Sequence, residues 1–376
     1  MKPNISTLTI DSFRAFRQLR IEHLGRVNLI TGRNNTGKSS VLEALRILAS
    51  DASPSVIYSI LRFREEDAAE TEEPARALDP EGVFQLSSLF HGFPQFSDKP
   101  EPIIITSNGG SRPMKLRMEL GWFSEKREPD GSTRLVSQQE TLFDKGEALP
   151  SLVIEAGGAR RVLPLESMQR YSYRRSHWTR MDVADEPRLP CVFVSPYGGE
   201  QTATLGPLWD KIALSDREKD VVDALRIIDS EILAVSMVGG EGPRRTRTAI
   251  VRTASLPRPV PLRSFGDGLN RLFGIILSLV NAKDGLLLID EFENGLHHTV
   301  QADAWRAVFN LAQRLDSQVV ATSHSWDSIE AFQRAASENP EEGVLIRLSR
   351  KGEDIIPTLF REDELAVAAR DRIEVR

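Results

Sequence analysis

The hydrophobic pattern of the first fifty residues predicts two strands, a glycine-rich loop and a helix. Apolar and polar residues alternate at 8–10, and a second strand pattern runs over 27–30. The loop follows at 32–39, and beyond it Val41, Leu45 and Leu48 recur at the spacing of one helix face. The chain therefore begins with a strand that leads through a loop directly into a helix.

Further along the chain the period of the pattern changes twice. Strict alternation over 114–120, followed by apolar runs at 152–154 and 162–165 with glycines between them, predicts antiparallel strands. From 264 to 322, apolar strands alternate with amphipathic helices, which indicates a parallel sheet covered by helices. A serine and a glutamate at 215 and 218 form a capping box, which opens a helix inside a helical insert expected near 205–235.

Composition narrows the class of protein. The chain has 376 residues, of which 40% are hydrophobic and 27% charged, in the range of globular proteins. Its net charge of −6 excludes a generally basic protein, so any site for a polyanion must be a local patch. The longest apolar stretch, 272–280, is too short to span a bilayer, and we expect a cytoplasmic protein that does not bind membranes. A single cysteine, Cys191, excludes an internal disulfide and a cysteine-ligated metal cluster.

The glycine-rich loop fits a phosphate-binding motif. Its sequence Gly-Arg-Asn-Asn-Thr-Gly-Lys-Ser matches G-x-x-x-x-G-K-[ST], and a strand precedes it and a helix follows, as the motif requires. Backbone N–H groups of such a loop converge on phosphate oxygens, Lys38 meets the β- and γ-phosphates, and Ser39 reaches Mg²⁺. The residues expected to bind nucleotide here are Gly32, Asn34, Asn35, Thr36, Gly37, Lys38, Ser39 and Ser40. A chance match is the weaker alternative because both flanking elements are present.

A second motif ends the apolar strand at 286–289 with two adjacent acids. Core packing gives no reason for paired carboxylates at a strand end. In a nucleotide site Asp290 would hold Mg²⁺ and Glu291 would polarise the attacking water in line with the γ-phosphoryl group. A strand that simply emerges into solvent is the alternative, and the phosphate loop makes it the weaker one.

Two further features stand near this chemistry. Ser264 and Gly266 precede a helix and form a possible anion site, for which a second copy of the chain would supply the phosphate; an ordinary capped helix is the alternative. His324 follows the strand pattern at 319–322, where its imidazole would contact the γ-phosphate, although a lone histidine is more often an ordinary residue.

The order of these motifs resembles the ABC-type ATPase heads of the SMC and RecF kind. More narrowly, the opening 8–48, with Phe13-Arg14-Ala15-Phe16, and the sequence Asp-Glu-Phe-Glu-Asn-Gly-Leu-His at 290–297 look like the OLD-family ATPases. Many members of that family act in bacterial defence against phages. The resemblance covers roughly 1–50 and 260–330. It implies an α/β P-loop NTPase fold, with an ABC-type head, an additional antiparallel β region and a helical insert.

The resemblance also implies roles and partners. The cofactors would be ATP and Mg²⁺, and the metal would be held by Ser39 and Asp290. The catalytic residues would be Lys38, Glu291 and His324, and Arg14 would lie near the nucleotide. Ser264 and Gly266 would act in trans within a homodimer or larger homo-oligomer. Asp267 stands where transporter signatures carry a second glycine. The chain lacks the length for the C-terminal Toprim nuclease domain of OLD nucleases, so we expect an ATPase without intrinsic nuclease activity that controls a separate effector, a nuclease or toxin, with DNA or RNA as a trigger.

Two other functions stay open at this point. One is a RecF-like clamp that uses ATP to grip DNA, for which five arginines interleaved with aromatic residues would contact phosphates and bases: Arg160, Arg161, Arg174, Arg175 and Arg180. A solvated arginine-rich surface is the favoured account of that cluster. The other is a scaffold that binds ATP structurally and turns it over slowly.

Four regions of one composite ATPase domain are expected. Residues 1–62 would form an N-terminal lobe with the phosphate loop, and 63–190 an inserted connector and antiparallel β region with a candidate partner surface. Residues 191–255 would be a helical subdomain. Residues 256–376 would be a C-terminal lobe with the signature (Ser264 and Gly266), the Walker B acids (Asp290 and Glu291) and the switch histidine (His324).

Overall fold

The fold was analysed in a computed structural model of the chain. It describes residues 3–64, 86–94, 100–110, 113–127, 133–137, 148–164, 188–196, 202–239, 247–339 and 342–360. Residues 65–85, part of the connector expected within 63–190, and the arginines at 174, 175 and 180 lie outside these residues. In the described part, none of the helices is both long and apolar enough to cross a membrane.

A six-stranded sheet forms the centre of the molecule. Its strand order is β16-β15-β3-β14-β13-β9, in which the last five are parallel and β16 is antiparallel to β15. The strands are β3 (Val27–Gly32), β9 (Cys191–Val194), β13 (Leu286–Ile289), β14 (Gln318–Thr322), β15 (Gly343–Lys351) and β16 (Asp354–Phe360). Since β3, β14 and β13 are parallel neighbours, the residues that follow them meet at one edge of the sheet.

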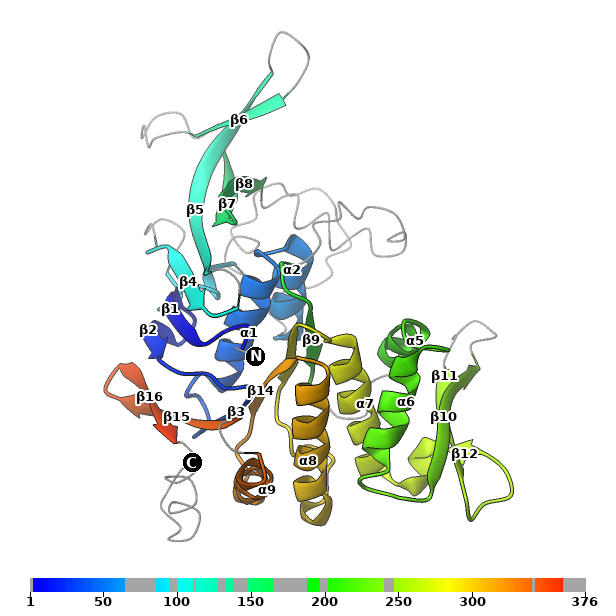
Figure 1. Cartoon of the computed structure of the whole chain (residues 1–376). Helices are drawn as coiled ribbons and strands as arrows, with labels where there is room; N and C mark the ends of the chain where they lie inside the picture. Colours follow the sequence, from blue (N-terminus) through cyan, green and yellow to red (C-terminus); the bar gives the residue numbers. More distant parts are fainter. Residues whose placement is uncertain are drawn as a thin grey trace.

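Helices cover both faces of this sheet, as the apolar strands require. Leu287 and Ile289 of β13 point into one core, and Leu286 and Leu288 point into the other. The first core is shared with α5 (Thr202–Asp210), α6 (Asp216–Leu225), η3 (Leu262–Phe265), α7 (Asp267–Asn281), α8 (His298–Arg314) and α9 (Trp326–Ser337). The second core contains α1 (Lys38–Ala49) and α2 (Pro54–Phe63) (Figure 1).

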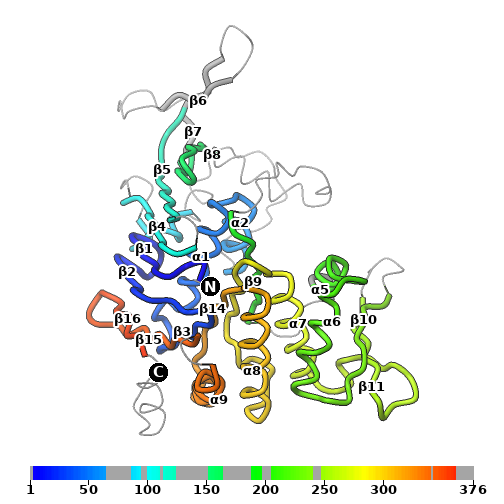
Figure 2. Tube along the Cα trace, in the orientation of Figure 1, coloured from blue at the N-terminus to red at the C-terminus, as the bar shows by residue number. Residues whose placement is uncertain are grey.

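A second, antiparallel sheet packs on the far side of α1. Its order is β2-β1-β4-β5-β7-β8, with β6 paired to β5. The strands are β1 (Thr7–Phe13), β2 (Phe16–Ile21), β4 (Ile103–Asn108), β5 (Met114–Arg127), β6 (Thr133–Ser137), β7 (Ala148–Ala156) and β8 (Ala159–Pro164). Strand β5 begins beside α1 and continues away from the body of the molecule (Figure 2). The predicted antiparallel region is therefore confirmed.

The region predicted as a helical subdomain, 191–255, contains more strand than expected. Helices α5 and α6 confirm the insert, but Cys191–Val194 is an edge strand of the central sheet. Beyond α6, β10 (Ile232–Gly239), β11 (Arg247–Thr253) and β12 (Val260–Pro261) form a three-stranded sheet. Burial alternates along β11 and over Val235–Met237 of β10, which is the period of a strand with one buried face and not of a helix.

Candidate functional site

The phosphate loop joins β3 to α1 with backbone that only glycine adopts readily. Gly37, the residue before α1, has φ 84°, in the left-handed region. A Cβ atom at Gly37 would lie 2.6 Å from Cζ of Phe16, the first residue of β2. The predicted strand, loop and helix are thus present, and the antiparallel sheet packs directly against the loop.

Lys38 folds over the loop that precedes it. Its ammonium group donates hydrogen bonds to the carbonyl oxygens of Gly32 (2.9 Å) and Arg33 (3.1 Å). Burial lowers the pKa of Lys38, and the carboxylates of Asp290, Glu291 and Glu293 oppose that shift. Lys38 is therefore in the electrostatic field of the acids that follow β13, although 252 positions separate Lys38 from Asp290 in the sequence.

Ser39 and Asp290 meet across the edge of the sheet. The Ser39 hydroxyl donates to Oδ1 of Asp290 at 3.1 Å, and the hydroxyl of Thr322 donates to the same oxygen at 2.6 Å. Asp290 itself is buried. A hydroxyl and a carboxylate at hydrogen-bond distance are hard oxygen donors of the kind that Mg²⁺ takes, usually together with water and substrate phosphates. The residues present therefore fit a magnesium site completed by a nucleotide.

Glu291 is held in a strained conformation beside Asp290. Its φ is 50°, which is unusual for a residue with a side chain, and its N–H donates to the hydroxyl of Thr322 at 2.9 Å. The amide of Asn294 donates to Oε2 of Glu291 (2.5 Å) and to the carbonyl of Pro196 (2.9 Å). Asn294 thus fixes the direction of the Glu291 carboxylate, which stays partly exposed.

His324 lies at the end of β14, next to both glutamates. Its Nδ1 is 3.2 Å from Oε1 of Glu293 and 3.9 Å from Oε1 of Glu291. The same Glu293 oxygen accepts the backbone N–H groups of His324 (2.9 Å) and Ser325 (3.1 Å). Glu293 is buried, and within the described residues its Oε2 has no hydrogen-bond partner. The predicted histidine therefore stands at the site, positioned by an acid to which the sequence assigned no role.

Arg271 connects α7 to this edge of the sheet. Its side chain is 1% exposed and donates to the carbonyl oxygens of Ser195 (2.7 Å) and Asp290 (3.3 Å). A Cβ atom added at Gly295 would lie 3.7 Å from Cβ of Arg271, and one added at Gly268 would lie 3.2 Å from the carbonyl oxygen of Gly295. Sequence reasoning missed Arg271, because a charged residue in an amphipathic helix is usually on its solvated face.

Other predicted site residues lie elsewhere. Ser264 and Gly266 are exposed at η3 and at the start of α7, where Arg263 pairs with Asp267, and in the described part of the chain neither makes a hydrogen bond to the phosphate loop. Their action in trans stays a prediction. The hydroxyl of Thr36 turns back to the carbonyl of Arg33 (2.8 Å).

Arg14 is buried beside α1 rather than extended over the loop. Its Nε lies 2.6 Å from a carboxylate oxygen of Glu43, and its Nη1 donates to the carbonyl of Ser88 at 3.3 Å. Arg64 pairs with the other oxygen of Glu43. The buried ion pair with Glu43 stabilises Arg14 in this position. The contact of Arg14 with a nucleotide remains a prediction.

Comparison with known proteins finds similarity to ATPase domains in two parts of the chain. The family described as "AAA ATPase domain" matches residues 1–133, and "AAA domain, putative AbiEii toxin, Type IV TA system" matches 210–329. An ATP/GTP phosphatase of Helicobacter pylori is 21% identical over 383 aligned positions, covering 96% of both chains. The DNA replication and repair protein RecF of Xanthomonas axonopodis is 26% identical over 264 positions, 58% of this chain and 67% of RecF.

The solved structures decide the fold. A crystal structure of an SMC head bound to the C-terminal winged-helix domain of ScpA superposes with a TM-score of 0.52 at 10% identity, covering 97% of this chain and all of that one. This chain has the fold of an ABC-type P-loop ATPase related to SMC and RecF. The predicted fold class is therefore confirmed, and within it the phosphate loop (32–39) contacts Asp290 through Ser39.

Proposed function

We propose that this protein is an OLD-like ATPase that binds and hydrolyses ATP as a switch and controls a partner effector. One observation carries the proposal: Ser39 of the phosphate loop donates to Asp290, beside Glu291 and within reach of Lys38. Two segments far apart in the sequence, 38–39 and 290–291, thus converge on one point. The full-length similarity to an ATP/GTP phosphatase supports the hydrolytic part of the proposal.

Each residue has a defined task in this proposal. The backbone of the loop and Lys38 bind the phosphates and offset their charge, and Ser39 and Asp290 would hold Mg²⁺, which neutralises charge that develops on the phosphoryl group. Glu291, its carboxylate directed by Asn294, accepts a proton from the attacking water. His324, held by Glu293, faces the γ-phosphate side of the site and reports whether that phosphate is present.

Dimerisation around the nucleotide is the second part of the proposal. Ser264 and Gly266 lie exposed at the start of α7, a 15-residue helix whose N-terminus favours anions. In a head-to-tail pair, this turn would close on the phosphate held by Lys38 of the other copy. Arg271 of helix α7 donates to the carbonyl of Asp290 in the same copy, so closure would act on the residue next to Glu291.

Nucleotide-dependent self-association tests both parts. Glu291→Gln removes the base but keeps the shape of the side chain, so ATP should trap a dimer that light scattering or sedimentation detects. Lys38→Ala should bind no ATP and stay monomeric, and Glu291→Gln should hydrolyse ATP at least a hundredfold more slowly than the unaltered protein. Equal self-association of the two variants with ATP would refute the trans site, and equal hydrolysis by unaltered protein and Glu291→Gln would favour the ATP-binding scaffold.

A role in anti-phage defence, exercised through a separate nuclease or toxin, completes the proposal. It draws on the resemblance to OLD-family ATPases and on the AbiEii-type family that matches residues 210–329. Cells that carry the gene with its neighbours should resist phage infection, and Lys38→Ala should abolish that resistance. Resistance that persists in the Lys38→Ala cells would show that nucleotide binding has no part in it.

A RecF-like DNA clamp is the second candidate, favoured by the similarity to RecF over more than half of the chain. Of the arginines expected to bind nucleic acid, Arg160 pairs with Glu155 and Arg161 donates to the carbonyl of Asp51, so both have roles within the fold. The discriminating measurement is salt-dependent DNA binding with Arg174 and Arg175 replaced by Ala. A marked loss of affinity and of salt dependence would favour the clamp.

A further inference from the structure

The peptide group between Asp290 and Glu291 lies just beyond the parallel ladder of the central sheet. In that ladder, Ile289 is the last residue of β13 that pairs with β14 and with β9. Beyond it, Nη2 of Arg271 donates to the carbonyl of Asp290 at 3.3 Å. The hydroxyl of Thr322 accepts the N–H of Glu291 at 2.9 Å. Two side chains thus hold this peptide group at a place where a longer strand would have backbone partners.

The two bonds reach the peptide group from opposite sides. Thr322 ends β14, which lies on one side of β13. Arg271 also donates to the carbonyl of Ser195 (2.7 Å), which directly follows β9 on the other side of β13. A trans peptide is planar and its C=O and N–H groups point in opposite directions, so bonds at both ends fix the rotation of the plane.

The peptide group on the other side of Glu291 is fixed as well. The N–H of Phe292 donates to the carbonyl of Thr322 at 3.0 Å. With both flanking peptide groups held, Glu291 stays at φ 50°, in the left-handed region that costs free energy for a residue with a Cβ atom. When one of these bonds is lost, the strained residue relaxes toward a common conformation and its Cβ atom points elsewhere. The direction of the Glu291 carboxylate therefore depends on these bonds.

We propose that Arg271 is a positioning residue for Glu291. By holding the carbonyl of Asp290, it keeps Glu291 in the left-handed conformation that directs the carboxylate toward the attacking water, a role that rests on the proposed ATPase function. Arg271 is buried, so its bond to Asp290 forms in a medium of low dielectric constant, where hydrogen bonds are strong. A guanidinium suits the task because its rigid, planar fork donates to the carbonyl groups of Ser195 and Asp290 at once.

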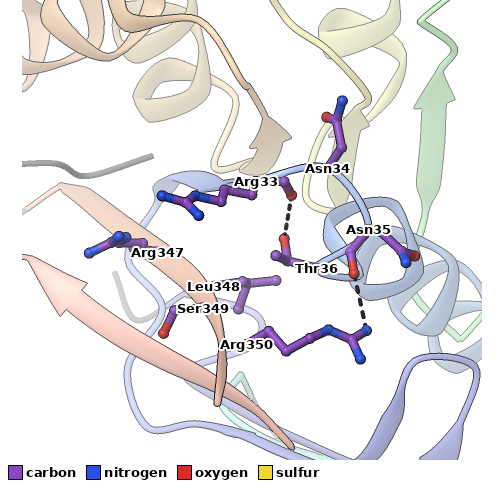
Figure 3. Close-up of a pocket in the computed structure, with 8 residues that line it drawn as sticks. All are labelled: Arg33, Asn34, Asn35, Thr36, Arg347, Leu348, Ser349 and Arg350. Carbon is purple, nitrogen blue, oxygen red and sulfur yellow. Dashed lines mark hydrogen bonds between the residues drawn. The ribbon is translucent and has the colours of Figure 1, made fainter. Parts of the chain in front are cut away.

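ATP binding should not depend on Arg271, because the phosphate loop has hydrogen bonds of its own. Within the loop, the hydroxyl of Thr36 donates to the carbonyl of Arg33 at 2.8 Å (Figure 3). Lys38 donates to the carbonyl of Gly32 at 2.9 Å. The proposal therefore predicts a lower rate of hydrolysis without a loss of affinity, as expected for an interaction that acts in the chemical step.

A double-mutant cycle with Glu291→Gln tests the proposal, with rates expressed per molecule that binds ATP. Arg271→Lys keeps the charge but loses the fork, so kcat should fall about tenfold, with the Kd for ATP within about twofold of the unaltered protein. In the Glu291→Gln background, which has no base to position, the same change should lower kcat by less than about twofold. Arg271→Met, which has no donor, should lose at least as much kcat as Arg271→Lys.

The matched control is Arg26→Lys. Arg26 is also buried, but it lies just before β3, at the end of that strand away from the phosphate loop, where it pairs with Asp316 and Glu342. This variant should lose stability in urea denaturation and keep its kcat. A control that loses as much kcat as Arg271→Lys would show that any loss of stability lowers the rate, and the proposal would fall.

Three further results would contradict the proposal. Equal losses of kcat in both backgrounds would mean that Arg271 acts through the fold and not through Glu291. A loss of ATP affinity in place of rate would put its effect at the phosphates, and an unchanged kcat in Arg271→Met would show that Glu291 needs no such support. If the unaltered protein and Glu291→Gln hydrolyse ATP equally, the proposed ATPase function itself fails.

Discussion

Oε1 of Glu293 accepts the backbone N–H of His324 at 2.9 Å and lies 3.2 Å from Nδ1 of the same residue. One buried carboxylate oxygen therefore holds both the main chain and the ring of the histidine. With Nδ1 facing Glu293, the ring presents Nε2 away from it, and so its direction is set before any nucleotide binds.

Replacing Glu293 should lower the rate of ATP hydrolysis without weakening ATP binding. Glu293→Ala removes the acceptor of the His324 N–H and frees the ring, while the Ser325 N–H keeps the Ser323 hydroxyl as an acceptor. We therefore expect kcat to fall about tenfold or more, with the Kd for ATP within twofold of the unaltered protein. Glu293→Gln keeps an acceptor oxygen and should retain most of the rate. In a double-mutant cycle, the double variant Glu293→Ala/His324→Ala should hydrolyse ATP only slightly more slowly than the single variant His324→Ala. Losses that multiply would mean that Glu293 acts independently of the histidine.

Arg271→Met should destabilise the fold. The guanidinium donates hydrogen bonds to the carbonyl groups of Ser195 and Asp290 at the edge of the sheet, and methionine can replace neither of them. The expected loss in the free energy of unfolding is about 2–4 kcal/mol, measured by urea denaturation. The exposed Arg334→Met should change it by less than about 0.5 kcal/mol. Equal stability of the two variants would argue against a structural role of Arg271.

Gly37→Ala should abolish ATP binding and cost more stability than an alanine at another left-handed glycine. Gly37 (φ 84°) and Gly92 (φ 79°) have nearly the same backbone conformation, but an added Cβ meets Phe16 at Gly37 and no atom within 4 Å at Gly92. Gly92→Ala should therefore cost only the conformational penalty, about 1–2 kcal/mol, and keep ATP affinity. Thermal unfolding and calorimetry together test this comparison, and similar stability losses at both positions would show that Phe16 gives way to the added methyl group.

The affinity for ATP should fall at alkaline pH. Burial lowers the pKa of Lys38, and nearby carboxylates, Glu293 among them, keep its ammonium group charged. The charged form binds phosphate, so affinity should be constant at neutral pH and decrease as the pH rises through the lowered pKa. Glu293→Gln removes one supporting charge, which should move the decrease to lower pH. Calorimetry across the alkaline range measures both curves, and coincident curves would exclude this coupling between Glu293 and Lys38.

Features that depend on short stretches of sequence were predictable. The phosphate loop and the Asp290-Glu291 pair each adjoin an apolar strand, and parallel strands bring their following residues to one edge, so their convergence followed from pattern and topology. Long-range polar contacts were not predictable in this way. Arg14 looks free to reach a ligand, yet its partner Glu43 lies on a helix face that periodicity alone describes as merely amphipathic.

The same limit applies to the residues that hold Glu291 and His324. Glu293 and Asn294 are visible next to the Walker B acids, but their partners His324 and Pro196 come from distant segments. Likewise, Thr322 is the last residue of a buried strand, and only the structure shows that its hydroxyl joins Asp290 to the backbone of Glu291.

The helix that carries Lys38 lies between two sheets and contacts both. Leu116 and Met118, at the inner end of β5, share one core with Val41 and Leu45 of α1, while the outer end of β5 continues away from the body. A force applied to that outer end would reach the nucleotide site through packed side chains rather than through a flexible connection. In mechanical terms β5 is a lever, and the helix at its pivot begins with Lys38, the residue that we propose binds the phosphates.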